Sequence, residues 1–332
     1  MTSGLFLTHM DSSSQKIGWG LIGPGRFAQQ FAAQLREVPR ANLIAVASRN
    51  LDRSKAFAEE FGFKRAYGDY ESIFSDEEVD IIYIVVPHTF HRQLAEQAIH
   101  SDKAVLCEKP LTPTAEDTRN LISLAKDKDV FLMEAMKTGF LPAIRKAKQW
   151  IEEGAIGTPQ ILKADFCFLG SQDPKDRLLN PDLAGGAILD VGIYPLYLAQ
   201  NLFGDFEEIR AAGSLAETGV EHTVSMAGKH QNGATSAMTC SFNSAVAMDA
   251  VVLGTEGEIR IPKFHAAVEA ELLQDGKLME KINDDGGGKL RGEIEAVTDS
   301  LLAGEKECFG HTHYDTQKLA NNMDEVRRQV LN

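Results

Sequence analysis

The first part of the chain alternates between short apolar runs and amphipathic stretches. An apolar run at 17–22 leads into a glycine turn, after which Phe27, Phe31 and Leu35 recur every four residues. This spacing predicts a helix whose apolar stripe packs on a sheet. Strands alternating with helices predict a doubly wound parallel sheet. The predicted strands are 17–22, 43–47, 81–86, 104–107 and 130–133, and further helices are predicted at 54–61, closed by Gly62, and from Thr112-Pro113 onward.

The remainder of the chain has a different pattern. Apolar side chains occupy every second position from 160 to 168, and two alternating stretches flank Asn232-Gly233, a pair that favours a β-hairpin. These signals predict an α+β second domain with one large, open, mostly antiparallel sheet. The predicted strands are 160–168, 222–230, 234–242, 247–253 and 258–261, with helices at 142–153 and 316–330 and a loop at 284–288.

The length of the chain predicts two domains. Its 332 residues exceed the roughly 250–300 at which a single core stops growing. We expect a dinucleotide-binding domain at 16–137 and a substrate-binding, dimerising domain at 138–332. Residues 1–15 are predicted to be a disordered tail, with Met10 as a second candidate start. The apolar patch at 5–7 is too short for a signal-peptide core.

Charge and cysteine usage exclude several classes of protein. A net charge of −14 argues against nucleic acid and anionic membranes, because both attract basic surfaces. The four scattered cysteines show neither a C-x-x-C pair nor histidine-rich spacing, so we expect no disulfide framework and no metal site. No apolar run approaches the ~18 residues of a membrane span. The sequence therefore predicts a cytoplasmic protein.

The glycine turn carries the first chemical signal. Gly23, Gly25 and Ala28 fit G-x-G-x-x-G/A between a strand and a helix, a pattern typical of dinucleotide sites. Arg26 and Phe27 open the helix, whose free N–H groups and positive end attract phosphates. A plain glycine turn is the alternative, but the position in the first strand–helix unit favours a dinucleotide.

The end of the second strand distinguishes NADP from NAD. NAD sites usually place an acid there for the ribose 2′-hydroxyl, whereas this chain has Ser48-Arg49-Asn50 followed by Arg53. Arg49 can pair with a 2′-phosphate, which favours NADP over NAD. The alternative is that Arg49 is only a surface arginine.

Two further loops follow predicted strands at the carboxyl edge of the sheet, where open α/β sheets bind ligands. The first contains Pro87, His88 and His91, one of which is expected to line the nicotinamide pocket; His91 alternatively caps the next helix. The second contains Glu108 and Lys109. A Lys-Pro pair after a strand is by itself more often structural, but this lysine would point at the nicotinamide.

In the second domain, Asp190 and Tyr194 lie four residues apart, so on a helix they face the same way. The combined motifs resemble the glucose–fructose oxidoreductase and inositol dehydrogenase (Gfo/Idh/MocA) family from Ile17 to Leu331. Tyr194, together with the Glu134-Ala135-Met136 stretch, resembles the dimeric dihydrodiol dehydrogenase and NADP-linked xylose dehydrogenase branch. The segments that carry the resemblance are 23–28, 108–110, 133–136, 185–194 and 254–259.

The resemblance implies a Rossmann domain followed by a sheet domain that commonly forms a homodimer through its open face. It also implies that Lys109 is the catalytic lysine, Tyr194 the proton donor or acceptor, and Asp190 an orienting or substrate-binding acid. A nearby lysine favours phenolate and lowers the tyrosine pKa from its free value near 10. Which of Lys109 and Tyr194 transfers the proton stays open. Core packing of Tyr194 and a capping role for Asp190 are the structural alternatives.

The chain also departs from this branch, which often carries Trp and Arg where Lys137 and Gly139 stand here. We expect a changed substrate pocket. Glu134, Phe140 and Phe168 are candidate pocket residues, whereas Arg177 and Lys163 are interpreted as solvated charges.

The resulting hypothesis is an NADP-dependent oxidoreductase acting on a sugar, a sugar-like polyol or a trans-dihydrodiol. The alternatives are a non-catalytic dinucleotide or sugar sensor on the same fold and a glycosidase-like enzyme with tightly held NAD. Retention of both Lys109 and Tyr194 argues against the sensor, and Arg49 against the NAD enzyme.

Overall fold

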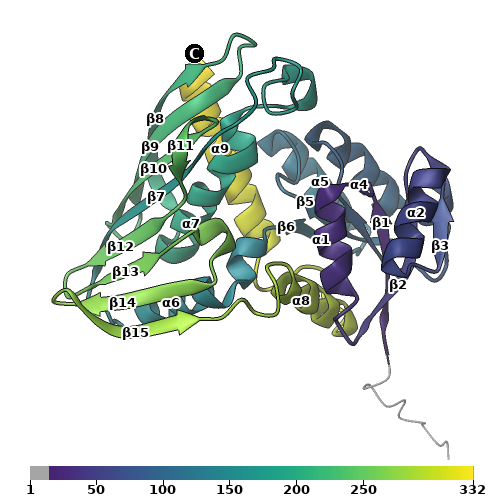
Figure 1. Cartoon of the computed structure of the whole chain (residues 1–332), viewed down its shortest axis with the longest axis horizontal. Helices are drawn as coiled ribbons and strands as arrows, with labels where there is room; N and C mark the ends of the chain where they lie inside the picture. The colour runs from purple at the N-terminus through teal and green to yellow at the C-terminus, as the bar shows by residue number, and fades with distance from the viewer. Residues whose placement is uncertain (1–14, 332) are drawn as a thin grey trace, which may run out of the picture.

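The computed structural model describes residues 15–331, which form two domains side by side (Figure 1). Apart from Gln15, the predicted tail at 1–15 lies outside the described residues. The first domain is built on a parallel sheet, in which every apolar residue of the first strand is buried. Its strands are β1 Ile17–Ile22, β2 Ala41–Ala47, β3 Arg65–Tyr67, β4 Ile81–Ile84, β5 Ala104–Glu108 and β6 Leu132–Ala135.

Within the described residues this sheet has six strands in the order β3-β2-β1-β4-β5-β6, which confirms the doubly wound parallel arrangement. Helices cover both faces, and a separate apolar core fills each side. Phe31 and Phe57 belong to one core, and Leu94 and Leu121 to the other. The helices are α1 Arg26–Leu35, α2 Leu51–Phe61, α3 Glu71–Phe74, α4 His91–His100 and α5 Ala115–Asp127, with a 3₁₀ turn η1 at His88–Phe90.

Two helix starts differ from the prediction because of their caps. α2 begins before residue 54, since the Asn50 side chain accepts a hydrogen bond from the Arg53 N–H at 3.0 Å. α5 is capped by Thr114, whose hydroxyl accepts from the Asp117 N–H. The predicted cap, Thr112, instead donates its hydroxyl to the Thr114 carbonyl at 2.8 Å, so the Thr112-Pro113 start is wrong.

The second domain contains the large sheet. Its order is β15-β14-β13-β12-β7-β10-β9-β8, with β11 paired to β7. In this sheet, as far as residues 15–331 describe it, only β7 and β10 pair in parallel, so the mostly antiparallel prediction is confirmed. The hairpin turns at Gly233, with φ 86°. The strands are β7 Pro159–Leu169, β8 Phe206–Leu215, β9 Glu221–His230, β10 Thr235–Ser241, β11 Asn243–Ala247, β12 Ala250–Gly254, β13 Glu258–Ile261, β14 Glu269–Gln274 and β15 Lys277–Asn283.

Helices cover one face of this sheet and leave the other open (Figure 1). Leu162, Ala164 and Phe166 of β7 turn inward to the shared core. The covering helices are α6 Pro142–Glu152, α7 Ile193–Phe203 and α9 His313–Leu331, accompanied by the short turns η2 Lys137–Phe140, η3 Pro181–Leu183, η4 Ile188–Gly192 and η5 Phe264–Ala266.

The C-terminal helices connect the two domains. Helix α8, Arg291–Leu302, follows the second sheet in sequence, yet its Ile294 and Val297 belong to a core of the first domain (Figure 1). Helix α9 touches both domains: its Asp324 accepts the Ala115 N–H, and its Gln329 donates to the Ile209 carbonyl. Among residues 15–331, no helix has the length and apolar character required to cross a bilayer.

Candidate active site

The glycine turn after β1 has the geometry that its sequence predicts. Gly23 adopts a left-handed φ of 96°, and an added Cβ would lie 2.4 Å from the Val85 carbonyl oxygen. At Gly25, the residue before α1, an added Cβ would meet nothing closer than Arg53 Nη2 at 3.8 Å. Space therefore remains beside Gly25 for a ligand that approaches the helix N-terminus.

A cavity of about 770 Å³ starts at this turn and ends at residues of the second domain. Its size suits an extended small ligand. Lys109, Asp190 and Tyr194 line its far part. The predicted cofactor residues in its wall are Gly23, Gly25, Arg26, Phe27, Ser48, Arg49, Arg53, Pro87, His88 and Glu108.

The end of the cavity near β2 is rich in arginine. Arg53 Nε donates to the Pro24 carbonyl at 3.0 Å, and the Arg49 guanidinium lies 5.9 Å from the Phe90 ring centroid. Ser48 is buried, and its hydroxyl shapes the turn by donating to a neighbouring backbone carbonyl. Among the described residues that line this cavity, no carboxylate occurs at the arginine end.

In the loop after β4, one predicted pocket residue, His91, does not line the cavity. Pro87 and His88 line the cavity, but His91 is fully buried behind it. The His91 ring nitrogens lie 2.8 Å from the Pro110 carbonyl oxygen and 2.9 Å from the Val86 carbonyl oxygen. His91 is also the first residue of α4, where its side chain makes no capping bond. It therefore connects the two loops and neither lines the pocket nor caps the helix.

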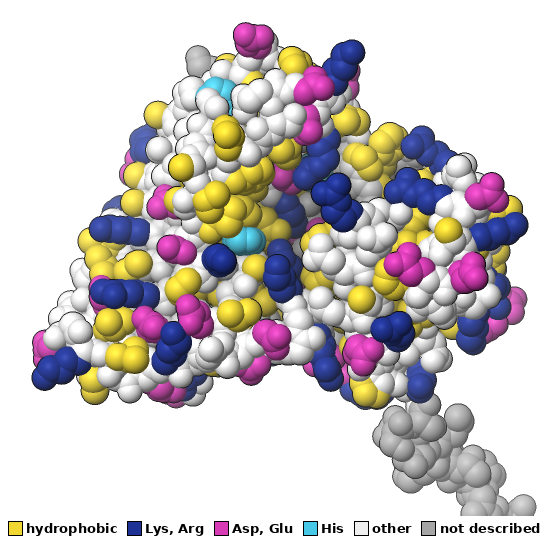
Figure 2. All heavy atoms as spheres, viewed as in Figure 1, with side chains coloured by type: hydrophobic (Ala, Val, Ile, Leu, Met, Phe, Trp, Pro, Cys, Tyr) yellow, Lys and Arg dark blue, Asp and Glu magenta, His cyan; other side chains and the backbone are white. Residues whose placement is uncertain are grey.

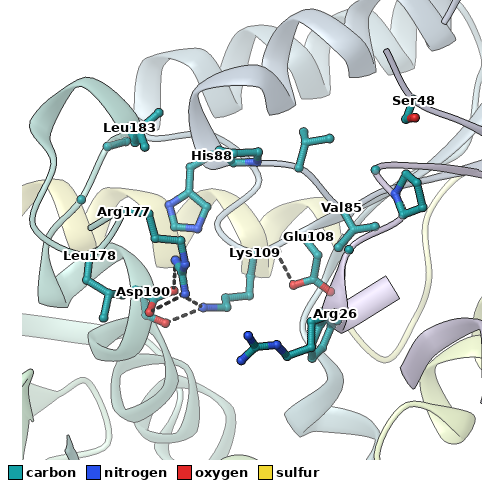
Figure 3. A pocket seen from close by; sticks show the side chains of 18 of the residues that line it. Arg26, Ser48, Val85, His88, Glu108, Lys109, Arg177, Leu178, Leu183 and Asp190 are labelled. Carbon is teal, nitrogen blue, oxygen red and sulfur yellow. Dashed lines mark hydrogen bonds and ion pairs between the residues drawn. The ribbon is translucent and has the colours of Figure 1, made fainter. Parts of the chain in front are cut away.

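Lys109 and Asp190 meet across the domain boundary (Figure 3). Lys109 Nζ donates to the Asp190 carbonyl oxygen and lies 3.3 Å from Asp190 Oδ1. Arg177 approaches the same carboxylate at 3.3 and 3.4 Å. The Arg177 side chain is 57% exposed, so it is a solvated charge as the sequence predicts, but it also pairs with Asp190 at the cavity. Lys163 is exposed on β7. No periodic signal surrounds Arg177, because it lies on an irregular loop.

The charges of this cluster support one another. Burial opposes ionisation of Asp190, but Lys109 and Arg177 outweigh it and hold the pKa of the carboxyl well below its usual range. Burial likewise opposes the Lys109 cation, but Asp190, Tyr194 and Glu108 together raise its pKa. Both groups are consequently charged at neutral pH.

Two carboxylates, Glu108 and Glu134, stabilise the turn that carries Lys109. Glu108 accepts a hydrogen bond from the Tyr83 hydroxyl at 2.6 Å, and burial raises the pKa of its carboxyl. Glu134 is 2% exposed and accepts the Leu111 N–H at 2.8 Å. Its other oxygen lies 2.9 Å from His311 Nε2. Glu134 therefore stabilises this turn and does not line the cavity.

Tyr194 stands where a π-helical turn, η4, passes into α7. Such turns are rare in proteins, and many of those that do occur lie at functional sites. Both Asp190 and Tyr194 line the cavity, as their spacing predicts. The Tyr194 hydroxyl accepts from Lys137 Nζ at 2.9 Å, whereas Lys109 Nζ lies 4.9 Å from the ring centroid. Burial raises the pKa of Tyr194 to about 12, so the lowering expected from Lys109 is outweighed.

Lys137 and Gly139, which stand where the related branch often has Trp and Arg, both lie against tyrosines of α7. Lys137, on η2, is 7% exposed. At Gly139 an added Cβ would lie 2.0 Å from the Tyr197 hydroxyl, so Tyr197 fills the space of a side chain there. The rings of Phe166 and His265 flank Tyr194 at 5.3 and 5.9 Å.

Two family models match the two parts of the chain whose residues line the cavity. The description "Oxidoreductase family, NAD-binding Rossmann fold" applies to residues 17–136, and "GFO/IDH/MocA C-terminal domain" applies to residues 144–260. The chain belongs to the Gfo/Idh/MocA oxidoreductase family. It is a nicotinamide-dependent dehydrogenase or reductase that acts on CH–OH groups.

Two relatives are trans-1,2-dihydrobenzene-1,2-diol dehydrogenases. Those of Danio rerio and Mus musculus are each 33% identical, over 95% of this chain and 97% of their own length. The resemblance to dihydrodiol dehydrogenases indicated by the sequence motifs is thereby confirmed.

Solved structures share the fold at lower identity. An aldose–aldose oxidoreductase from Caulobacter crescentus, complexed with glycerol, has a TM-score of 0.87 at 24% identity, covering 95% of this chain and 97% of that one. A 3-ketoreductase from Actinomadura kijaniata, with NADP and TDP-benzene, has a TM-score of 0.85 at 24% identity, over 95% and 98%. A levoglucosan dehydrogenase with NADH and levoglucosan has 0.85 at 22%, over 95% and 97%.

Among residues 15–331, no group of three or more histidine, cysteine, aspartate or glutamate side chains is placed to hold a metal ion.

Proposed function

We propose that the protein is an NADP-dependent oxidoreductase that transfers a hydride between nicotinamide and a trans-dihydrodiol, a sugar or a sugar-like polyol. The observation that carries the proposal is the single cavity that joins the arginine-lined glycine turn to Lys109, Tyr194 and Asp190. The names of the two dihydrodiol dehydrogenase relatives support the dihydrodiol as a substrate class.

The cofactor, when bound, accepts or supplies the hydride at its nicotinamide ring. Lys109 donates a hydrogen bond to the reacting substrate oxygen and places positive charge where negative charge develops. Asp190 orients Lys109 through the contact at 3.3 Å. Tyr194 gives a proton to the new alkoxide in reduction and takes it back in oxidation.

The experiment that tests this function follows the absorbance of reduced nicotinamide. Purified protein is mixed with NADP or NAD and with aldoses, inositols and trans-dihydrodiols in turn. Turnover with NADP supports the proposal and identifies the substrate class. Cofactor binding without turnover on the whole panel would favour the non-catalytic sensor, and failure to bind either cofactor would refute the proposal.

The preference for NADP rests on the arginine end of the cavity. Arg26, Arg49 and Arg53 line it without a carboxylate, although Glu71 lines a smaller cavity of about 360 Å³ that shares Arg49. The solved neighbours do not decide the matter, because one contains NADP and another NADH. An acid at this end would repel a 2′-phosphate, whereas a guanidinium can bind it with two hydrogen bonds.

Arg49→Ala is therefore expected to weaken NADPH binding by about tenfold or more, since a hydrogen bond to a charged group is worth about 1.5–3 kcal/mol. NADH binding should change little. Calorimetric titration with both cofactors measures this, with the exposed Arg36 at the end of α1 replaced by alanine as the matched control. An equal loss for NADPH and NADH would show that Arg49 does not bind the 2′-phosphate.

We also propose a homodimer formed through the open face of the large sheet. Ile161 lies on that face, 37% exposed, between Thr235 and Leu253 of the adjacent strands. Light scattering should give twice the 36.4 kDa chain mass. Ile161→Lys should return the mass to that of one chain, because each copy would then bury an unpaired charge in the interface. A monomer in the unmodified protein would contradict the proposal.

Location in the cytoplasm is part of the same proposal. It is supported by the four buried cysteines Cys107, Cys167, Cys240 and Cys308, which are free thiols.

A further inference from the structure

Two lysines approach Tyr194, but they contact different parts of it. Lys109 lies against the ring and is turned toward Asp190. Lys137 lies 4.5 Å from the ring centroid and reaches the hydroxyl, with Nζ 2.9 Å from the phenol oxygen. The cation bonded to the proton-carrying atom is therefore Lys137.

The chemistry of an ammonium group fixes the direction of this hydrogen bond. An ammonium has three donors and no acceptor, so the Tyr194 oxygen must accept. The phenol proton is then directed away from Lys137. Tyr194 lines the cavity, and a substrate oxygen there can receive that proton.

Lys137 is also unusual as a buried cation. It is 7% exposed, and no carboxylate among residues 15–331 forms an ion pair with it. Burial lowers the pKa of its amine, so it loses its proton more readily than an exposed lysine. An unpaired buried charge is costly, and such groups concentrate at functional sites.

Titratable groups face Lys137 from every surrounding element. They are Glu108 at the end of β5, Lys109 beside it, Asp190 on η4, Tyr194 on α7, His265 on η5 and Glu293 on α8. Neither carboxyl oxygen of Glu293 has a hydrogen-bond partner among the described residues, and burial holds the pKa of that carboxyl well above its usual range. Glu293 therefore makes no hydrogen bond to Lys137.

We infer that Lys137 is a positioning residue that controls the proton of Tyr194, an inference that rests on the proposed function. Its N–H group directs the phenol proton toward the cavity. In reduction, the substrate carbonyl carbon gains the hydride of the reduced nicotinamide, and its oxygen gains the Tyr194 proton. The O–H bond of Tyr194 breaks, and the negative charge left on its oxygen is stabilised by the Lys137 ammonium. Oxidation reverses these transfers.

The kinetic test compares Lys137→Met with Lys137→Arg. Methionine has a similar length and removes a buried charge, so folding is preserved. We expect kcat to fall by about 10²-fold with KM nearly unchanged, as for removal of an oxyanion donor. Arginine keeps the donor and should restore part of the rate. In a Tyr194→Phe background, Lys137→Met should have no further effect, because Lys137 acts through Tyr194.

Lys128→Met, at an exposed position after α5, is the matched control and should leave kcat unchanged. A loss of kcat that adds fully to that of Tyr194→Phe would overturn the inference, as would an unchanged kcat in Lys137→Met.

A second measurement does not depend on turnover. Protein labelled with ¹³Cζ-tyrosine gives one resonance for each of the six tyrosines. The resonance of Tyr194 is identified as the one that is missing from the spectrum of Tyr194→Phe. This resonance should show an inflection below the ordinary lysine range as Lys137 loses its proton, and this inflection should disappear in Lys137→Met. If the inflection is present but the protein shows no turnover, the proposed function is refuted and the coupling between Lys137 and Tyr194 still stands. Absence of the inflection in an active enzyme would refute the inference and retain the function.

Discussion

Lys109→Met is expected to lower kcat by about 10³-fold while NADPH binding changes only slightly. Electrostatic stabilisation of a developing oxyanion contributes about 10²–10³-fold in comparable sites. The orientation of Tyr194 against the lysine, 4.9 Å from its ring, is lost as well. Initial rates with the substrate found in the panel, together with calorimetric titration of NADPH, measure the two effects separately.

The fold should survive this substitution, because Asp190 keeps a second cationic partner. Arg177 lies 3.3 Å from the same carboxylate, so the buried acid is not left alone. The loss of stability should remain below the roughly 3–5 kcal/mol typical of breaking a buried pair completely. Lys128→Met again provides the control. A kcat within about threefold of the unmodified enzyme would show that Lys109 is structural.

Tyr194→Phe is expected to lower kcat by about 10²–10⁴-fold, the usual contribution of a positioned acid or base. Phenylalanine keeps the ring and its contacts with Phe166 and His265. It removes the hydroxyl and the acceptor for Lys137. Rates in both directions across the pH range test whether this hydroxyl transfers the proton.

The pH dependence has a definite sign. Burial raises the pKa of Tyr194 to about 12, so the phenol is protonated at neutral pH. Reduction needs the protonated form, and its kcat should stay nearly constant between about pH 6 and 8. Oxidation needs the phenolate, and its kcat should rise by up to about tenfold per pH unit below that pKa. A rising oxidation rate that persists in Tyr194→Phe would assign the proton transfer to another group.

Much of the fold could be predicted from local pattern. The strand at β4, Ile81–Ile84, is buried along its whole length, and this appears in the sequence as a continuous apolar run. Asn232-Gly233 predicted the hairpin because its backbone conformation is a local property of those residues. The glycine turn was predicted for the same reason, since only glycine fits at Gly23.

Two missed elements, β15 and α8, escaped prediction for different reasons. Strand β15, Lys277–Asn283, is almost entirely exposed at the sheet edge and rich in charge, so it lacks the alternation that reveals a strand. Helix α8 does show apolar positions at Ile294 and Val297, but it lies after the second sheet and packs on the first domain. No local signal indicates that return.

The sequence by itself determined the local features, which are the apolar periodicity, the glycine turn and the types of residue at the carboxyl ends of the strands. Tertiary structure alone decided which charges meet. Lys109 and Asp190 are separated by 81 residues, and Lys137 and Tyr194 by 57. It also moved His91 behind the cavity and brought Arg177 into it. The physical reason is that a pKa or an ion pair depends on distance and burial, which only the packed domains establish.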